Sequence, residues 1–156
     1  MNVLHHTFKF RTAGEWQDVS TIELFKDKKI ILFGLPGAFT PTCSSKQLPG
    51  YEENYNKLKE LGIDEVYCIS VNDAFVMNAW ADAQGIEKVK MIPDGCGTFT
   101  RSLGMLVNKP KQGFGLRSWR YSMIIDNEII TYLAEEPGIN NFSNDSDPYI
   151  ESTPEK

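Results

Sequence analysis

Short apolar runs alternate with amphipathic stretches along most of this chain. Runs that are apolar throughout are typical of strands covered on both faces, and period-two alternation is typical of half-exposed strands. Apolar residues three or four positions apart, bounded by capping residues and glycine, predict helices. The strands expected from these patterns span residues 6–10, 16–19, 30–33, 65–71, 89–92, 118–125 and 128–134.

Two helices are expected after the third of these strands. Thr40 is a good N-cap and Pro41 suits the first helical position, so a helix is expected to begin there. The dipeptide Pro49-Gly50 is expected to interrupt this helix, and a second helix is expected over 51–61. The apolar face of the second helix comprises Tyr51, Tyr55, Leu58 and Leu61.

Another helix is expected after the strand at 65–71. Asn72 or Asp73 caps its start, and Gly85 stops it. A shorter helix is expected over 97–103. The apolar stripe expected on the longer helix comprises Phe75, Val76, Ala79, Trp80 and Ala83.

Capping and turn residues mark the connections. The capping-box spacing at 20–23 predicts a short helix or turn over 21–25. A Gly-rich loop is expected over 109–115, and a two-residue hairpin turn at Asp126-Asn127. The tail over 135–156 is dense in Asn, Ser, Asp and Pro, which predicts a loop-rich segment.

The predicted order is a β-hairpin, then alternating strands and helices, then a second hairpin. Alternating units require parallel strands covered by helices, and the last hairpin adds antiparallel strands, so the pattern predicts a mixed α/β protein. We find no internal repeat and no domain boundary. A single domain over 1–156 is expected, which is long enough to bury a core.

Composition narrows the function classes. The net charge of −5 argues against nucleic acid or an anionic membrane as a partner. No apolar run approaches the ~20 residues of a membrane span, and the N-terminus lacks the pattern of a signal peptide. Three cysteines do not suggest a secreted disulfide framework. We therefore expect a protein of a reducing, cytoplasmic compartment.

A reactive thiol is expected at Cys43. Glycine and proline end the strand over 30–33, and the predicted helix starts at Pro41, so Cys43 falls in the first helical turn. Free backbone N–H groups and the positive end of the helix dipole favour the thiolate there. The alternative from the residues alone is a small buried hydrophobe, because free cysteines are usually buried and inert.

The same stretch carries a family motif. Pro36, Thr40 and Cys43 match the peroxiredoxin motif Pro-x-x-x-Thr/Ser-x-x-Cys, and the run Pro-Gly-Ala-Phe-Thr-Pro-Thr-Cys-Ser resembles the type II, peroxiredoxin-5 subfamily. The resemblance also includes residues 70–80 and the segment Arg-Tyr-Ser-Met, and it extends to about Ala134. It implies a thioredoxin-like fold, with a central mixed sheet flanked by helices and an N-terminal β-hairpin.

The resemblance implies a thiol peroxidase acting on hydrogen peroxide and alkyl hydroperoxides, with Cys43 as the attacking thiol. In the family, the hydroxyl at the position of Thr40 hydrogen-bonds the thiolate and peroxide, and the proline at Pro36 shields the thiolate. The family also has an arginine that lies beside the sulfur, and its position corresponds to Arg120 in this sequence. Arg117 competes for this role, but strand alternation predicts that the two arginines lie on opposite faces, so at most one would point at Cys43.

Four further residues are candidates for substrate contact. Leu35, Phe39 and Phe114 could wall an apolar pocket over the thiolate, and Gly37 lies in the same loop as the thiol. Leu35, Phe39 and Phe114 are equally suited to an ordinary core.

The other two cysteines bear on the catalytic cycle. Cys68 falls in the middle of a strand and is expected to be buried and inert, while Cys96 falls in a turn. The resolving cysteine of two-Cys relatives lies nearer the C-terminus, where this chain has none. We therefore expect a one-Cys cycle in which Cys43 becomes a sulfenic acid and an external thiol reduces it, with a Cys43–Cys96 disulfide as the alternative. The resemblance implies glutathione with glutaredoxin, or else thioredoxin, as reductant, and a homodimer.

Other chemistries find little support. The chain lacks Cys-x-x-Cys, P-loop and Gly-x-Gly-x-x-Gly spacings, so no bound cofactor is expected and electrons come from a partner. His5-His6 lacks further metal ligands at suitable spacing, so no metal is expected. A redox-sensing or holdase-like protein that uses Cys43 as a switch is the alternative function. A glutathione-peroxidase-type enzyme is a third.

Overall fold

The elements follow the alternation of apolar and amphipathic stretches along the chain. A computed structural model describes residues 3–40 and 46–136. In chain order the elements are β1 (Thr7–Thr12), β2 (Glu15–Ser20), α1 (Thr21–Phe25), β3 (Lys29–Gly34), α2 (Leu48–Glu53), α3 (Tyr55–Glu60), β4 (Glu65–Ser70), α4 (Ala74–Gln84), β5 (Lys90–Pro93), α5 (Thr98–Ser102), β6 (Leu106–Lys109), the 3₁₀ turn η2 (Pro110–Gln112), β7 (Gly115–Ser118), β8 (Tyr121–Asp126) and β9 (Ile129–Glu135).

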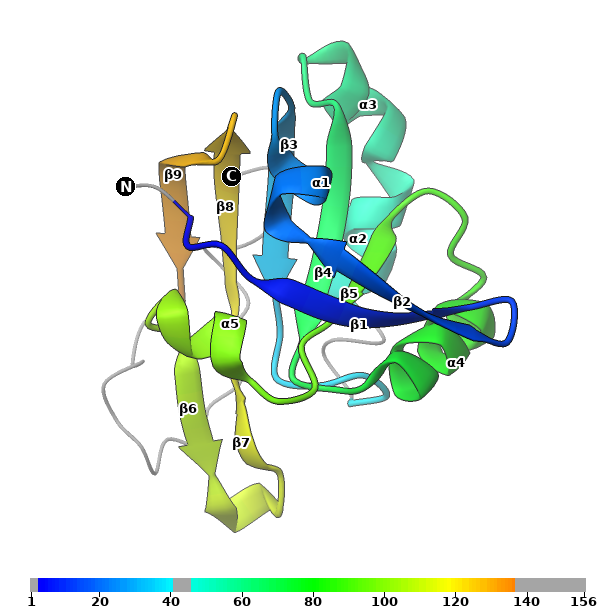
Figure 1. Cartoon of the computed structure of the whole chain (residues 1–156), viewed down its shortest axis with the longest axis vertical. Coiled ribbons are helices and arrows are strands. Elements are labelled where there is room, and N and C mark those ends of the chain that lie inside the picture. Colours follow the sequence, from blue (N-terminus) through cyan, green and yellow to red (C-terminus); the bar gives the residue numbers. More distant parts are fainter. Residues whose placement is uncertain (1–2, 41–45, 137–156) are drawn as a thin grey trace.

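A five-stranded mixed sheet occupies the centre, with the strand order β5-β4-β3-β8-β9 (Figure 1). β3, β4 and β5 are parallel, whereas β8 and β9 run antiparallel to their neighbours. The β1–β2 hairpin crosses in front of this sheet, and β6 and β7 extend beyond one end of it (Figure 1). The predicted thioredoxin-like α/β fold and its N-terminal hairpin are confirmed.

β3 is apolar throughout because both of its faces are covered. Ile30 and Leu32 point into a cluster formed with the hairpin, α1 and α5. Ile31 and Phe33 point the other way, into a cluster formed with α2, α3 and α4. Successive side chains of a strand alternate between faces, so this one run supplies both halves of the core. It also places the end of β3, at Gly34, between the two layers.

The buried face of α4 differs from the predicted stripe. The helix starts at Asp73, whose carboxylate accepts the Val76 amide at 2.9 Å. Ala74, Met77 and Trp80 form the buried face, so of the predicted stripe only Trp80 is fully buried. The sequence did not show which face of α4 is buried, because the helix has apolar residues on two adjacent faces. The second apolar face meets the hairpin: Phe75 is 55% exposed and its ring packs edge-to-face on Trp16 at 5.4 Å.

The interruption between α2 and α3 lies at Asn54, and not at Pro49-Gly50 as predicted. Proline is tolerated in the first helical turn, where its missing N–H has no intrahelical acceptor, and α2 accommodates Pro49 there. Asn54 instead leaves the helical conformation and donates its side-chain amide to the Gly50 carbonyl at 2.8 Å. Leu61, expected on the buried face, is 69% exposed.

The region before β8 contains more strand than the sequence indicated. The stretch predicted as a loop over 109–115 includes the end of β6, which pairs with β7 around η2. The single strand predicted over 118–125 is divided, because Trp119 and Arg120 belong to neither β7 nor β8. The final hairpin turns at Asn127 and Glu128, one residue later than predicted, with both φ angles positive.

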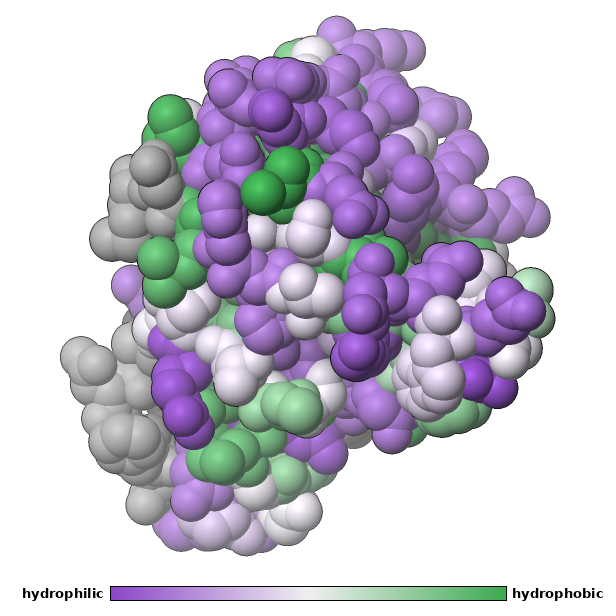
Figure 2. All heavy atoms as spheres, viewed as in Figure 1, coloured by the Kyte–Doolittle hydropathy of each residue, from purple (hydrophilic) through white to green (hydrophobic). Residues whose placement is uncertain are grey.

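The face that bears α1, the hairpin and α5 is mostly hydrophilic, and its hydrophobic surface is divided into small separate areas (Figure 2). Among the helices that the structure describes, none has the length and apolar character needed to cross a bilayer.

Candidate active site

The candidate site lies where β3 ends. Cys43 and the helix start expected at Pro41 fall within residues 41–45, outside the described part of the chain. The flanking segments are described, and they are residues 35–40 and a π-helical turn at 46–47 that leads into α2. Short π-helical turns are frequently found at functional sites.

Hydrogen bonds fold residues 37–40 into a tight turn. The Gly37 carbonyl accepts the Thr40 hydroxyl at 2.6 Å and the Thr40 amide at 3.4 Å. Phe39, between them, has a φ of 63° and is 56% exposed. A hydroxyl has one proton to donate, and that of Thr40 points at Gly37. Its lone pairs are therefore left to accept a hydrogen bond from a bound molecule.

The segment after β4 holds this turn from one side. The Asn72 side-chain oxygen accepts the Ala38 amide at 3.0 Å and lies 2.6 Å from the Ser70 hydroxyl. The sequence offered Asn72 or Asp73 as the cap of α4. Asp73 is that cap, and Asn72 is used to anchor the loop after β3.

Arg120 is 1% exposed and is connected through Gln47 to the end of β3. Its guanidinium donates to the Gln47 side-chain oxygen, and the Gln47 amide nitrogen donates to the Gly34 carbonyl at 3.2 Å. Gly34 ends β3 and Gln47 precedes α2, so Gln47 links Arg120 to the described segments on either side of residues 41–45. Burial of a cation is costly unless hydrogen bonds compensate it, and Gln47 supplies one.

Arg117 also contacts the loop after β3. Its Nε donates to the Phe114 carbonyl at 3.1 Å, and its Nη1 donates to the Pro36 carbonyl at 3.4 Å. The predicted opposite orientation of the two arginines assumed one continuous strand. That assumption is wrong, because the chain leaves β7 before Arg120, and both guanidinium groups approach the segment between Gly34 and Gln47.

The candidate pocket residues take different places. Leu35 is fully buried in the core cluster under α2 and α4, Phe39 is exposed, and Phe114 is half-buried with the Arg117 guanidinium 5.4 Å from its ring centre. Gly34 is packed against a ring: a Cβ there would lie 2.3 Å from Tyr121. Burial of that tyrosine raises its pKa well above the usual range, so it stays neutral under the site.

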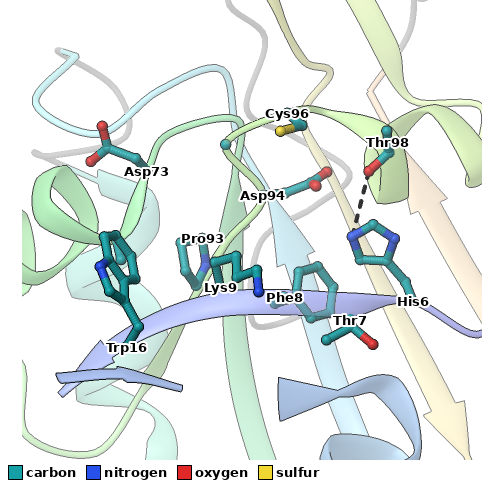
Figure 3. A pocket seen from close by; sticks show the side chains of 12 residues that line it. His6, Thr7, Phe8, Lys9, Trp16, Asp73, Pro93, Asp94, Cys96 and Thr98 are labelled. Atoms are coloured by element: carbon teal, nitrogen blue, oxygen red, sulfur yellow. Dashed lines mark hydrogen bonds between the residues drawn. The ribbon is translucent and has the colours of Figure 1, made fainter. Parts of the chain in front are cut away.

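The two described cysteines differ in access. Cys68 is completely buried in β4, as predicted, whereas Cys96 is exposed. Cys96 and Asp94, from the β5–α5 connection, face His6 and Phe8 of the N-terminal segment across a cavity of about 460 Å³ (Figure 3). Of the two, only Cys96 is accessible for the alternative disulfide with Cys43. Within residues 3–40 and 46–136, no cluster of His, Cys, Asp or Glu could hold a metal ion.

Sequence reasoning missed Gln47, Asn72 and the contact of Arg117 with Pro36. A signal existed for Gln47, because it lies four residues after Cys43 and would share a face with it in the helix expected from Pro41. The Arg117 contact joins residues 81 positions apart, and no local pattern reports such a contact.

Three comparisons place this geometry among known proteins. The Redoxin family model matches residues 5–148. A peroxiredoxin of Rhizobium etli is 54% identical over 158 residues, which cover 96% of this chain and 88% of that protein. The crystal structure of the Plasmodium falciparum antioxidant protein, a 1-Cys peroxiredoxin, has a TM-score of 0.93 at 38% identity and covers 99% of this chain and 94% of that one.

A solved complex of a relative is also similar. Reduced Prx3 of Vibrio vulnificus in complex with hydrogen peroxide has a TM-score of 0.88 at 40% identity, covering 99% of this chain and 92% of that one. The mixed sheet and its covering layers define a thioredoxin-like α/β protein. The chain belongs to the redoxin family, and within it to the type II peroxiredoxins, which are thiol-dependent peroxidases. The predicted membership of the type II peroxiredoxins is confirmed.

Proposed function

We propose that Cys43 is the peroxidatic thiol and that the enzyme reduces hydrogen peroxide and alkyl hydroperoxides. The Cys43 thiolate attacks one peroxide oxygen, a new S–O bond forms as the O–O bond breaks, and the other oxygen leaves with a proton as water or an alcohol. The sulfur is oxidised by two electrons to a sulfenic acid. The hydrogen peroxide complex of the Vibrio vulnificus relative supports this substrate class.

The observation that carries the proposal is the buried Arg120. Lowering a thiol pKa from ~8.5 to ~6 needs about 3.4 kcal/mol. A helix start supplies about 1–2 kcal/mol, and a charge-assisted hydrogen bond about 1.5–3 kcal/mol, so a cation is needed as well. Arg120 is held beside both ends of the Cys43 segment by Gln47. Arg120 would stabilise the thiolate and the charge that develops on the leaving oxygen.

The loop after β3 supplies the remaining roles. The Thr40 hydroxyl donates to Gly37, which supports a role as acceptor of the hydroperoxide O–H. Pro36 is buried and would shield the thiolate from water. Gly37 and Phe39 would line the entry of the substrate, with Phe114 at the edge and Leu35 as the floor.

We infer a one-Cys cycle reduced by glutathione with glutaredoxin. The sulfenic acid reacts with glutathione, an S–S bond forms and water leaves; a second thiol then reduces the mixed disulfide. Burial of Cys68 supports this cycle, because that thiol cannot resolve the sulfenic acid. Thioredoxin is the alternative reductant, and an intramolecular Cys43–Cys96 disulfide is the alternative path.

The proposal includes a single domain over residues 1–156, a homodimer and a cytoplasmic location. Two large exposed aromatic side chains support the dimer: Phe39, in the loop after β3, and Phe75, at the start of α4, are each more than half exposed. The net charge of −5 supports a partner other than nucleic acid or an anionic membrane.

Turnover with each reductant tests the function. Hydrogen peroxide and cumene hydroperoxide are supplied in excess, with the glutathione–glutaredoxin system or the thioredoxin system, to the wild type, C43S and C96S. We expect many turnovers with glutathione in the wild type and C96S, and none in C43S. Oxidation of one equivalent without turnover would favour the redox-sensing alternative. Mass spectrometry after one equivalent of peroxide would reveal an intramolecular disulfide, which would refute the one-Cys cycle.

A further inference from the structure

Arg117 joins two loops that are distant in sequence. Its Nε donates to the Phe114 carbonyl at 3.1 Å, in the connection that precedes β7. Its Nη1 donates to the Pro36 carbonyl at 3.4 Å, in the loop that follows β3. The guanidinium carbon lies 5.4 Å from the centre of the Phe114 ring. The side chain is thus placed against Phe114 and directed at Pro36.

The Arg117 guanidinium occupies the space beside Gly37 that a Cβ would take. A Cβ at Gly37 would lie 2.6 Å from the Arg117 Nη1 and 3.1 Å from the Thr40 Cγ2. The backbone at Gly37 is outside the left-handed region, so its conformation alone does not require glycine. A Cβ at Gly37 would therefore displace the Arg117 guanidinium, which is the far end of a flexible side chain.

Two successive peptide groups of the loop are held from different sides. The carbonyl of the Pro36–Gly37 peptide accepts Arg117, and the N–H of the Gly37–Ala38 peptide donates to Asn72. The carbonyl of this second peptide accepts the Thr40 hydroxyl and amide. The direction of the Thr40 hydroxyl thus depends on the Gly37–Ala38 peptide, which is joined to the peptide that Arg117 holds through the Gly37 Cα.

We propose that Arg117 is a positioning residue of the peroxidase site, which holds the Pro36–Gly37 peptide so that Thr40 presents its lone pairs to the hydroperoxide. The inference rests on the proposed function of Cys43 and Thr40, and it adds a second arginine with a different task. Arg120 acts through its charge, whereas Arg117 acts through hydrogen bonds to carbonyl groups. Holding a reacting group in place is a large part of catalysis, so loosening the loop lowers the rate.

Five variants test this assignment. R117A removes both hydrogen bonds, and R117K keeps one donor but not the two-donor fork. G37A displaces the guanidinium while leaving it in the protein, and G37A/R117A tests whether the two changes act through the same contact. R101A, an exposed arginine on α5, controls for loss of a charge, and G95A, where a Cβ would make ordinary contacts, controls for glycine replacement.

The main measurement is the second-order rate constant for oxidation of Cys43 by hydrogen peroxide, as a function of pH. We expect about a tenfold loss in R117A and in G37A, partial recovery in R117K, and no change in R101A or G95A. The double variant should be no slower than R117A alone. The pH midpoint, which reports the thiolate, should stay at the wild-type value in R117A because the charge at the sulfur comes from Arg120.

Three results would overturn the proposal. They are a wild-type rate in R117A, additive losses in the double variant, and a pH midpoint that rises in R117A, since the last would make Arg117 a charge donor to the sulfur. Amide hydrogen exchange at Thr40 gives a readout that needs no activity, and we expect faster exchange in R117A than in R101A. If the wild type is not oxidised by peroxide, the proposed function fails. The exchange at Thr40 still tests whether Arg117 holds the loop after β3.

Discussion

Burying an arginine costs desolvation free energy, and Arg120 is a clear case in this protein. Its side chain is 1% exposed, and its guanidinium donates to Gln47, which is itself fully buried. Arginine is almost never fully buried unless it is paired, and Gln47 is one partner of Arg120. In the proposed function, the Cys43 thiolate is another. Arg120 thus differs from Arg117 in its burial and in the groups that it contacts.

The first prediction compares these arginines. R120A should slow the peroxide step by about 100-fold, because it removes a charge-assisted hydrogen bond and the buried cation, while R117A should cost about tenfold. R120A should also raise the pH midpoint of Cys43 oxidation. Stopped-flow oxidation by hydrogen peroxide measures both quantities. Equal rate losses in R120A and R117A would remove the distinction between their roles.

The second prediction concerns Gln47. Q47L keeps the volume of the side chain but loses the bridge from Arg120 to the Gly34 carbonyl, so we expect about a tenfold slower peroxide step. The thermal unfolding midpoint is measured in parallel to separate rate from stability. Q17L, at an exposed position of β2, is the matched control. An unchanged rate in Q47L would mean that Arg120 is positioned without this bridge.

At the scale of elements, two carboxylates join the helices α2 and α3 to the strands on one side of the sheet. Glu52 of α2 accepts the amides of Glu87, Lys88 and Val89 at 2.9–3.2 Å, just before β5. Glu65 of β4 accepts the hydroxyl of Tyr55 in α3 at 2.8 Å and pairs with Lys90 of β5 at 2.9 Å. These contacts tie the helices that follow the candidate site to the parallel half of the sheet.

The third prediction follows from Glu65. Burial opposes its ionisation, but the hydrogen bonds from Lys90 and Tyr55 outweigh it and lower the pKa below the ordinary value of 4.5. A lowered folded-state pKa contributes stability that is present above about pH 4.5 and lost as the pH falls through the folded value. E65Q should therefore be less stable than the wild type at pH 7, with a smaller difference at pH 3.5.

Urea unfolding at the two pH values measures this difference. E53Q, an exposed carboxylate at the end of α2, should behave as the wild type at both values. A stability gap for E65Q that does not change with pH would show that the ionised Glu65 contributes nothing specific.

At the scale of the whole molecule, the exposed aromatic residues are unevenly placed. Phe75 and Trp16 pack together at one end of α4, with the Arg11 guanidinium 5.0 Å from the Trp16 ring centre. Phe39 is exposed in the loop after β3, which Asn72 anchors just before α4. Aromatic residues and arginine are enriched in protein interfaces, which supports the proposed dimer on the side of the candidate site.

The fourth prediction tests this dimer. The wild type should sediment near 35 kDa, twice the chain mass of 17.7 kDa. F75D places a charge in the proposed interface and should shift the protein towards the monomer, while L61D, at the exposed residue that follows α3, should not. Analytical ultracentrifugation across a range of concentrations measures the shift. A monomeric wild type, or equal behaviour of the two variants, contradicts the proposed interface.

The sequence by itself determined the family and the order of most elements, but not the β6–β7 hairpin. Local patterns sufficed for this, because a strand such as β3 is apolar throughout when both faces are covered, and a helix such as α1 begins where Ser20 can cap it. The motif from Pro36 to Cys43 carried the family in the same way, since its residues are neighbours in the chain.

The tertiary structure alone decided which groups meet. Neither the buried face of α4 nor the contacts of Arg117 and Arg120 follow from local patterns, because both depend on elements far away in sequence. Phe75 was predicted from helical spacing to lie on the apolar stripe of α4, but its ring packs on Trp16 of the hairpin instead. The Gln47 bridge arises only when the end of β3, the start of α2 and the segment before β8 are brought together. Backbone conformation is set by neighbours in the chain, whereas a site is assembled from segments that only folding brings into contact.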